Sequence, residues 1–327
     1  MTQDRMIWHN LGLVFQPQTS PLIASHAQLP TPIVLNDCIR VYYMARDAEN
    51  RGRIWAVDLD RTDPTRVLTH HPKPVLDIGE RGAFDDNGIA PSCAVRNGDE
   101  IWLYYTGISP RTTVSLSYAI GIAISRDGGI SFERYATGPI IDRTPQEGFL
   151  FASPHVLRDG PLWRMYYLCG TGWTTFNERP EMLYDIRYAE SDNGIDWRRE
   201  GVVCVAQANP EEAIARPWSF HTASGYGMFY CYRGSRDFRD GTDAYRIGLA
   251  TSSDGRHWQR QDNCIQVERS ANANPWDNLM QAYPTLAQVG DASYMIFNGN
   301  SFGKAGFGVA YLDSSQSQLF PRKAYNA

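Results

Sequence analysis

The sequence contains no apolar run as long as the roughly 18 residues that a membrane-spanning helix needs. Its N-terminal residues also lack a charged region followed by an apolar one, the pattern of a secretory signal peptide. Lys and Arg are scattered along a chain of net charge −5, so there is no basic stripe for nucleic acid or an anionic membrane surface. We therefore expect a cytoplasmic protein that binds neither nucleic acid nor membrane, and whose ligand is neutral or of mixed polarity.

Cysteine is sparse, and its spacing carries no metal or redox motif. The six cysteines stand far apart, without a Cys-x-x-Cys pair, and most of them lie in apolar segments. We expect buried, reduced thiols rather than disulfides or metal ligands. His155 and His221 belong to no spaced cluster either, so we expect core or hydrogen-bonding roles for them and predict no metal site and no cofactor.

The sequence does contain 28 glycines, 19 prolines and 12% aromatic residues, a composition typical of many short strands joined by tight turns. A repeat of about sixty residues organises them, and a fixed period of this length indicates a repeated structural unit. Each unit begins with a residue followed by proline and then an apolar segment. The five openings are Thr31-Pro32, Ala90-Pro91, Ser153-Pro154, Arg216-Pro217 and Tyr283-Pro284.

Each unit continues with two further strand signals. An aromatic segment such as Tyr104-Tyr105 follows the proline by some ten residues, and a third segment is centred on an alanine. Those alanines, spaced 60 to 67 residues apart, are Ala56, Ala123, Ala189, Ala250 and Ala310. Three units then have an Asp-Gly or Asn-Gly turn followed by an aromatic residue, which predicts a hairpin into a fourth strand. The pattern therefore predicts four-stranded antiparallel units, the blades of a β-propeller.

The fifth unit ends after its third strand, and the N-terminal segment supplies the missing fourth one. Residues 8–15 match the predicted fourth strand at 197–204, with Trp8 and Gly12 in the register of Trp197 and Gly201. Pairing with the last blade would close the ring and cover an open edge, although a chance match in a frayed terminus is the alternative. We predict an all-β fold in which residues 1–327 form one five-bladed propeller domain. Its blades are expected near residues 20–80, 81–143, 144–206, 207–270 and 271–315, the last completed by residues 7–15.

Ionisable residues stand five to seven positions before each repeated proline. The first strand of each propeller blade lines the central channel, so we expect these residues at the mouth of that channel. They are His26, Asp85, Asp86, Glu147, Glu211, Glu212 and Asp277. Carboxylates gathered in one pocket repel each other, so one can stay protonated as an acid while another acts as a base, as glycoside hydrolysis requires. Alternatively, some of them cap turns in the loops.

Further polar and aromatic residues are expected around the same mouth, because most of them flank a repeated proline or end a second strand. The candidates for substrate binding are His26, Arg46, Asp47, His155, Trp173, Arg216, Arg233, Tyr283, Asn298 and Asn300. Trp173 could stack on a sugar ring, although packing between blades is the commoner role of a tryptophan. Two loops, 171–181 and 235–243, have no counterpart in the other units, and we expect them to shape the mouth or to mediate contacts.

The Xaa-Pro openings, the Tyr-Tyr second strands, the third strand Ile-Gly-Ile-Ala-Ile-Ser-Arg-Asp-Gly at 120–128 and the N-terminal closure together resemble a known clan. It is the five-bladed glycoside hydrolase clan of families 43, 62, 32 and 68 and, more loosely, family 130. The resemblance covers nearly the whole chain and implies the five-bladed fold and a saccharide ligand. Segments 245–250 and 297–303 also look like propeller proteins found among bacterial surface-polysaccharide and sugar-biosynthesis genes.

The sequence departs from those families at their catalytic positions. Family 43 implies a base in Asp-Pro at the first opening and an acid in Glu-Gly-Pro at the third, where this chain has Thr31 and Ala152 instead. Family 130 implies an acid in Glu-Asp-Pro-Arg, where residues 89–92 read Ile-Ala-Pro-Ser. The resemblance therefore implies the fold more strongly than the activity.

We hypothesise a glycoside-processing enzyme that acts on a small saccharide or activated sugar in bacterial polysaccharide or sugar metabolism. Asp86 or Asp277 would be the base. Glu147 or Glu212 would be the acid, and Arg216 would hold a hydroxyl or carboxylate of the substrate. The alternative is a non-catalytic carbohydrate-binding or scaffold propeller, and transferase or lyase chemistry is a third possibility. Whether the channel binds a divalent ion is left open, and no oligomeric state is predicted.

Overall fold

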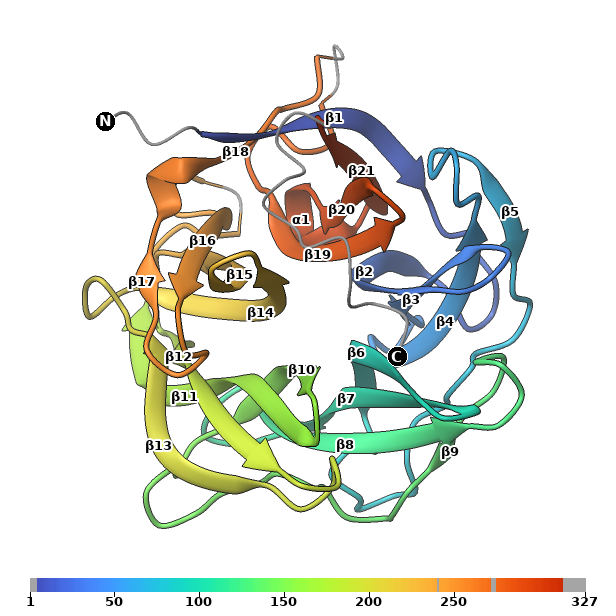
Figure 1. Cartoon of the computed structure of the whole chain (residues 1–327). Helices are drawn as coiled ribbons and strands as arrows, with labels where there is room; N and C mark the ends of the chain where they lie inside the picture. Colours follow the sequence, from blue (N-terminus) through green and yellow to red (C-terminus); the bar gives the residue numbers. More distant parts are fainter. Residues whose placement is uncertain (1–4, 240, 272–274, 314–327) are drawn as a thin grey trace.

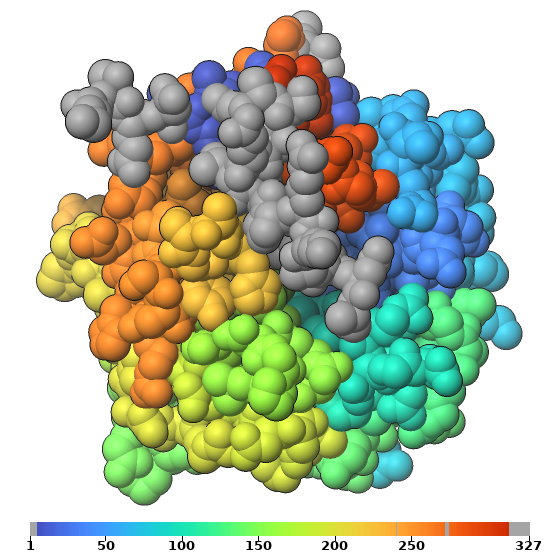
Figure 2. All heavy atoms as spheres, in the orientation of Figure 1, coloured from blue at the N-terminus to red at the C-terminus, as the bar shows by residue number. Residues whose placement is uncertain are grey.

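The computed structural model describes residues 5–239, 241–271 and 275–313. These residues form an all-β structure, as predicted, in which short sheets follow one another around a ring (Figure 1). Within these ranges the helical elements are the short turns η1 (Asp262–Cys264) and α1 (Asn300–Gly303). None of the described helices has the length and apolar character that would carry it across a membrane. Consecutive parts of the sequence occupy consecutive sectors of the molecular surface (Figure 2).

Two of the sheets have four strands each, arranged in the order of the sequence. The first contains β10 (Phe151–Asp159), β11 (Leu162–Phe176), β12 (Arg179–Ser191) and β13 (Arg198–Val205). The second contains β14 (Ala213–Thr222), β15 (Gly225–Arg233), β16 (Arg246–Ser252) and β17 (Gln259–Arg260). All neighbouring strands in both sheets are antiparallel. Each sheet is therefore an up-and-down unit of the kind that the sequence repeat predicts.

An eight-stranded sheet contains the first two repeat units. Its first half consists of β2 (Ser25–Val34), β3 (Ile39–Arg46), β4 (Gly52–Leu59) and β5 (Val67–His70). Its second half consists of β6 (Gly88–Asn97), β7 (Glu100–Pro110), β8 (Leu116–Ser125) and β9 (Glu133–Arg134). The halves meet through a single parallel residue pair, Gly52 with Gly88, whereas the strands inside each half pair along their length. The link between the halves is therefore local.

The last sheet joins the two ends of the described chain. Its strands are β19 (Ala282–Val289), β20 (Ala292–Asn298), β21 (Phe307–Leu312), β1 (Met6–Phe15) and β18 (Ile265–Val267). Strand β1 is antiparallel to β21, with Trp8 opposite Leu312 and Phe15 opposite Phe307. This is the predicted docking of the N-terminal segment, and it pairs an edge that would otherwise stay open. Trp8 is fully buried in the core shared with the neighbouring sheet.

The repeated Xaa-Pro motif marks a β-bulge in the innermost strands. Strands β2, β6, β10, β14 and β19 lie nearest the centre of the ring (Figure 1). Their pairing register shifts at the motif, for example between Ala152 and His155. Ser153, Arg216 and Tyr283, each directly before its proline, have positive φ angles of 49°, 57° and 57°. Such backbone is strained for residues other than glycine, and bulges of this kind redirect side chains.

The first tyrosine of the Tyr-Tyr strands connects each of the first three repeat units to the next. Its hydroxyl donates a hydrogen bond to a glycine carbonyl in the glycine turn of the following unit. The bonds are Tyr42 to Gly129 at 3.0 Å, Tyr104 to Gly194 at 2.8 Å and Tyr166 to Gly255 at 2.8 Å. All three donors are fully buried, so these bonds satisfy hydroxyl groups that would be costly to leave unpaired. The two sequence motifs therefore stabilise the junctions between repeat units.

Candidate functional site

A cavity of about 400 Å³ opens at the centre of the ring. Every innermost strand contributes to its wall, through Leu29, Ala90, Ser153, Ala215 and Tyr283 respectively. Two of these residues, Ser153 and Tyr283, have the strained backbone of the Xaa-Pro bulges. The bulges therefore place side chains from separate sheets around one cavity, which is where a propeller of this kind binds its ligand.

Two arginines that the sequence singled out lie in the cavity wall. Arg46 ends β3 and donates to the side-chain oxygens of Gln28 and Asn50, at 2.7 and 3.1 Å. Arg233 ends β15 and donates to the Met182 carbonyl at 2.9 Å and the Tyr184 hydroxyl at 3.2 Å. Both guanidinium groups therefore bond neutral oxygens in the described structure. Three of the candidates, Arg46, Arg233 and Tyr283, line this cavity.

Glu181 supplies the carboxylate of this cavity, and the sequence did not predict it as a site residue. Arg239 holds it with two hydrogen bonds of 2.5 and 3.0 Å, and the Glu181 side chain is buried. No other carboxylate lines the cavity among the residues that the structure describes. Glu181 lies in the extended hairpin of β11 and β12, so residues 171–181 are largely strand and not the loop that we expected. Glu181 and Arg239 lie in segments 171–181 and 235–243, which have no counterpart in the other repeat units, and this was the sequence signal that could have indicated them.

Aromatic side chains complete the wall. The hydroxyls of Tyr184 and Tyr245 are hydrogen bonded to each other, and the ring centre of Tyr283 lies 5.5 Å from that of Tyr245. Phe238 and Phe302 meet edge to face at 6.2 Å and form an apolar side of the cavity. Burial raises the pKa of the Tyr118 hydroxyl to about 12, so it stays neutral at physiological pH. The wall thus offers hydroxyl groups and ring faces, the two features that bind sugars.

The carboxylates predicted to be catalytic lie elsewhere. Asp85, Glu147, Glu212 and Asp277 are all buried, but none of them lines the cavity. Each accepts a hydrogen bond from a side chain on the fourth strand of its own repeat unit, which is β9, β13, β17 or β1. The bonds are Arg134 to Asp85 at 2.8 Å, Arg199 to Glu147 at 2.8 Å, Arg260 to Glu212 at 2.7 Å and Asn10 to Asp277 at 2.9 Å. The expectation that these groups gather at the channel mouth is therefore corrected.

The regular spacing of these acids has a structural cause. Their partners occupy one equivalent position, two residues after an aromatic residue at or near the start of the fourth strand of the unit. Those pairs of aromatic and partner are Phe132 and Arg134, Trp197 and Arg199, Trp258 and Arg260, and Trp8 and Asn10. Each hydrogen bond connects the loop before the innermost strand to the fourth strand of the same unit. It also gives the buried carboxylate the polar partner that it needs. The periodicity of the acids therefore reflects the assembly of each unit.

Two exposed or half-buried acids near these positions stabilise loops. Asp86 accepts hydrogen bonds from the Gly82 amide at 2.9 Å and the Ser109 hydroxyl at 3.3 Å. Glu211 pairs with Arg236 at 3.1 Å on the surface. For Asp86 the turn-capping alternative describes the observed contacts.

Arg216 lies fully buried between the innermost strands. It donates to the carbonyls of Pro30 and Pro91, each at 3.0 Å, and to the Thr31 hydroxyl at 2.7 Å. Burial lowers its pKa to about 10. Arg216 therefore joins β14 to β2 and β6 beside the cavity, and it is absent from the cavity lining, where we expected it.

Six further candidates also lie outside the cavity lining, which corrects their expected placement. They are His26, Asp47, His155, Trp173, Asn298 and Asn300. His155 bonds the Ser219 hydroxyl at 2.9 Å, and burial lowers its pKa to about 3, so it is a neutral core residue. Asp47 pairs with Arg53 at 2.7 Å. The Asn298 side chain accepts a hydrogen bond from the Leu29 amide at 2.8 Å and so positions a residue of the cavity wall.

The other three of these candidates have local partners. The His26 ring bonds the Ser25 hydroxyl at 2.7 Å, and burial lowers the pKa of His26 to about 4. The Asn300 side chain accepts hydrogen bonds from the amides of residues 279 and 280, both at 3.0 Å. Trp173 packs partly buried beside the cavity. These contacts hold the side chains of His26, Asn300 and Trp173 outside the cavity lining.

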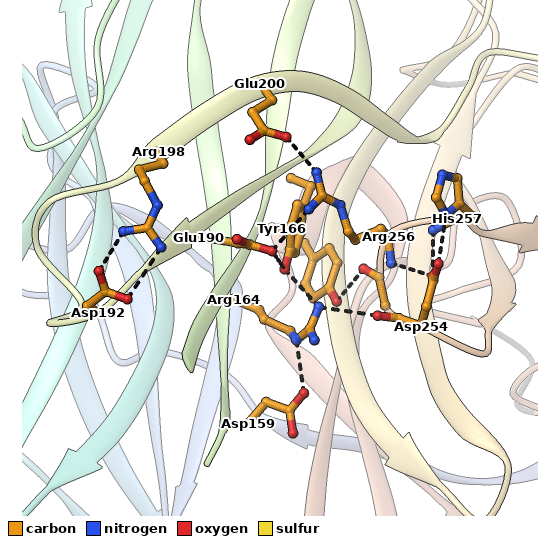
Figure 3. Close-up of polar contacts among 12 residues, drawn as sticks. Asp159, Arg164, Tyr166, Glu190, Asp192, Arg198, Glu200, Asp254, Arg256 and His257 are labelled. Carbon is orange, nitrogen blue, oxygen red and sulfur yellow. Dashed lines mark hydrogen bonds and ion pairs between the residues drawn. The ribbon is translucent and has the colours of Figure 1, made fainter. Parts of the chain in front are cut away.

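A second polar cluster lies between β11, β12 and the turn that follows β16 (Figure 3). Arg164 pairs with Asp159 at 3.0 Å and donates to the Asp254 carbonyl at 3.2 Å. Arg256 pairs with Glu190 at 3.4 Å. These charges are matched within the cluster, so its role is to join two sheets. In the described ranges, no three His, Cys, Asp or Glu side chains gather as they would around a metal ion.

No protein-family model matches the sequence. The protein Rv1502 of Mycobacterium tuberculosis, described as uncharacterised, is 34% identical over 314 residues, which cover 94% of this chain and 100% of that protein. A 1,2-beta-oligomannan phosphorylase of Thermoanaerobacter sp. is 31% identical over 135 residues, 40% of this chain and 43% of that enzyme.

Solved structures share the fold at low sequence identity. A glycoside hydrolase superposes with a TM-score of 0.73 at 16% identity, covering 98% of this chain and 94% of that one. A thermostable family-43 glycoside hydrolase superposes with a TM-score of 0.60 at 14% identity, covering 91% and 92%. The β-propeller fold of glycoside hydrolases that the sequence motifs implied is therefore confirmed.

Proposed function

This chain belongs to the family of the Mycobacterium tuberculosis protein Rv1502, and we propose that it binds a saccharide in the cavity at the centre of its glycoside-hydrolase-like propeller. The observation that carries this proposal is the wall of that cavity. Arginine and tyrosine side chains offer hydrogen bonds, and Phe302 offers an aromatic ring beside Phe238, on which Arg233 and Arg239 stack. The volume of about 400 Å³ lies within the roughly 300–1,000 Å³ of small-molecule sites.

Binding without hydrolysis agrees better with the side chains of the wall than hydrolysis does. Hydrolysis of a glycoside requires an acid for the leaving oxygen and a second carboxylate that acts as base or nucleophile. Among the described lining residues Glu181 is the single carboxylate, and Arg239 already occupies both of its oxygens. The opening positions with the catalytic acids of family 43 hold Thr31 and Ala152 here. We therefore place saccharide binding ahead of hydrolysis by the carboxylates that the sequence proposed.

Phosphorolysis is the second candidate, because part of the chain is similar to a 1,2-beta-oligomannan phosphorylase. In that reaction a phosphate oxygen attacks the anomeric carbon, the glycosidic C–O bond breaks, and one acid protonates the leaving oxygen. The products are a sugar 1-phosphate and the shortened saccharide, so a single carboxylate is sufficient. To act as this acid, Glu181 would have to leave its pair with Arg239 and take up a proton, and Arg46 and Arg233 would hold the phosphate.

We extend the proposal to the architecture and the setting of the protein. Five blades in one domain over residues 1–327, with the boundaries given above, agree with five innermost strands and with the local link inside the eight-stranded sheet. The six free cysteines support a reducing compartment such as the cytoplasm. A role in bacterial polysaccharide or sugar metabolism follows from the sequence resemblance alone.

The test uses two variants of one loop. Ser115 lies at the cavity and is exposed, so Ser115→Trp would obstruct it, whereas Thr112→Trp adds the same side chain nearby but outside the lining. Calorimetric titration with a saccharide panel should show binding that Ser115→Trp weakens and Thr112→Trp preserves. Equal affinity in both variants, or no binding to any saccharide, would contradict the proposal. Turnover that needs phosphate and disappears in Glu181→Gln, with binding retained, would instead support phosphorolysis.

A further inference from the structure

The charge of the cavity wall points to the charge of its ligand. The ionisable lining residues in the described structure that are charged at neutral pH are Arg46, Arg233, Arg239 and Glu181. Three cations and one anion leave the wall two positive charges in excess. Because the chain as a whole has a net charge of −5, this excess is a local property of the cavity.

Two of the three arginines carry the excess. Arg239 is paired with Glu181, whereas Arg46 and Arg233 bond side-chain amides, a hydroxyl and carbonyl oxygens. Neither of these two forms an ion pair within the described ranges, and Arg233 is only 3% exposed. A buried guanidinium without a counter-charge loses hydration energy that a bound anion can restore.

The contrast with Arg53, an arginine next to the same strand, shows what a counter-charge does. Burial lowers the pKa of Arg46. At Arg53 burial acts in the same direction, but hydrogen bonds to Asp47 and Asp77 outweigh it and raise the pKa. Arg53, outside the cavity, is thus paired with carboxylates, whereas Arg46, in the cavity wall, bonds side-chain amide oxygens.

The positive groups face a common volume. The positive charges of Arg46 and Arg233 both act on the hydroxyl of Tyr118, which also lines the cavity. Arg216 is a third arginine whose hydrogen bonds go to carbonyl and hydroxyl oxygens, among them the carbonyls of Pro30 and Pro91 beside the wall. The Tyr118 side of the cavity therefore has a positive electrostatic potential. Arg233 and Arg239 stack on the Phe238 ring at 3.7 and 4.2 Å, and Phe302 beside it supplies apolar surface.

We propose that the saccharide taken by this cavity bears an anionic group, a carboxylate or a phosphate, which binds between Arg46 and Arg233. This inference rests on the proposed saccharide binding and adds the class of the saccharide. Guanidinium groups bind both oxyanions through short, charge-assisted hydrogen bonds, so the chemistry is shared by uronic acids and sugar phosphates. The sugar ring would then lie toward Phe238 and Phe302.

Calorimetry on the full chain with matched sugars tests the inference. The probes are glucose, mannose and galactose, each beside its uronate and its 6-phosphate. We expect an anionic member of a set to bind at least about tenfold more tightly than its neutral parent, as charged hydrogen bonds predict. Preference for the uronates or for the phosphates identifies which anion the cavity takes.

Variants connect the preference to the arginines. Arg46→Met should weaken binding of the anionic sugar about 10- to 100-fold, and Arg46→Lys should restore part of the loss. Arg198→Met, which removes an exposed arginine paired with Asp192, is the control and should change nothing (Figure 3). Circular dichroism and thermal unfolding confirm that each variant is folded.

The outcomes separate this inference from the proposed function. If neutral sugars bind as tightly as their anionic forms and Arg46→Met has no effect, the anionic class is wrong while saccharide binding stands. If none of the sugars binds, both are overturned.

Discussion

Arg199, on the outermost strand β13, donates a hydrogen bond of 2.8 Å to Glu147, which stands 52 residues earlier in the loop before the innermost strand β10. The Tyr167 hydroxyl donates to the same carboxylate at 2.9 Å, and Arg187 lies 3.3 Å from it. Glu147 is 3% exposed, so these partners replace the water that its buried carboxylate would otherwise bond. Equivalent contacts at Asp85 and Glu212 make this a repeated feature of the units.

Loss of this arginine should destabilise the fold. In Arg199→Ala, the buried Glu147 carboxylate loses its 2.8 Å ion pair and keeps the longer one to Arg187 at 3.3 Å. We expect a loss of about 2–4 kcal/mol in the free energy of unfolding. The adjacent Arg198 pairs with the exposed Asp192, so Arg198→Ala should leave the stability nearly unchanged. Urea denaturation of both variants measures the difference. Equal stabilities would show that the contact does not stabilise the protein.

Closure of the ring by β1 should be essential for stability. Trp8 is fully buried and meets Phe229 of the adjacent sheet edge to face at 5.7 Å. Trp8→Ala should therefore cost about 3–5 kcal/mol, as for other large side chains removed from a core. Leu11 on the same strand is 40% exposed, and Leu11→Ala is the control. A similar melting temperature for the two variants would mean that β1 contributes little.

The hydrogen bonds between units can be tested one at a time. Tyr104→Phe removes the donor to the Gly194 carbonyl and leaves that buried oxygen without its bond, which should cost about 1–3 kcal/mol. Tyr135 is 51% exposed, and Tyr135→Phe should be nearly neutral. Chemical denaturation compares the two. The role assigned to the Tyr-Tyr motif would be wrong if Tyr104→Phe were as stable as the parent protein.

Acid should destabilise the protein through its buried histidines. Burial lowers the pKa of His155 from 6.5 to about 3, so the folded protein does not bind a proton that the unfolded chain binds below pH 6.5. The contribution of neutral His155 is therefore present above that pH and is lost as pH falls toward 3. Burial lowers the pKa of His26 in the same direction, to about 4.

Unfolding free energies at neutral pH and near pH 5 measure this dependence. His155→Asn should lose stability at neutral pH and show a smaller further loss on acidification than the parent. A decline in the variant as steep as that of the parent would assign the acid sensitivity to other groups.

Local chemistry and periodicity made much of the architecture predictable. The Xaa-Pro, Tyr-Tyr and Asp-Gly motifs depend on backbone preferences and short-range turns, so they indicate strands wherever they occur. The match of Trp8 and Gly12 to Trp197 and Gly201 predicted the pairing of β1 with the last sheet, because equivalent residues must meet equivalent surroundings. Arg46, Arg233 and Tyr283 were found in the cavity because they end or open strands that converge there.

The tertiary structure alone decided which side chains reach the cavity. The spacing of Asp85, Glu147 and Glu212 is compatible with two placements, at the channel mouth or against the outermost strand. A shift of one position in a loop can turn a side chain from one to the other, so the spacing does not choose between them. The choice depends on arginines about fifty residues later, whose approach only the folded sheet creates. Glu181 and Arg239 meet across segments that no repeat relates, so periodicity could not reveal them. Repetition in a sequence determines the common scaffold, whereas the site forms from the long-range contacts that break the repetition.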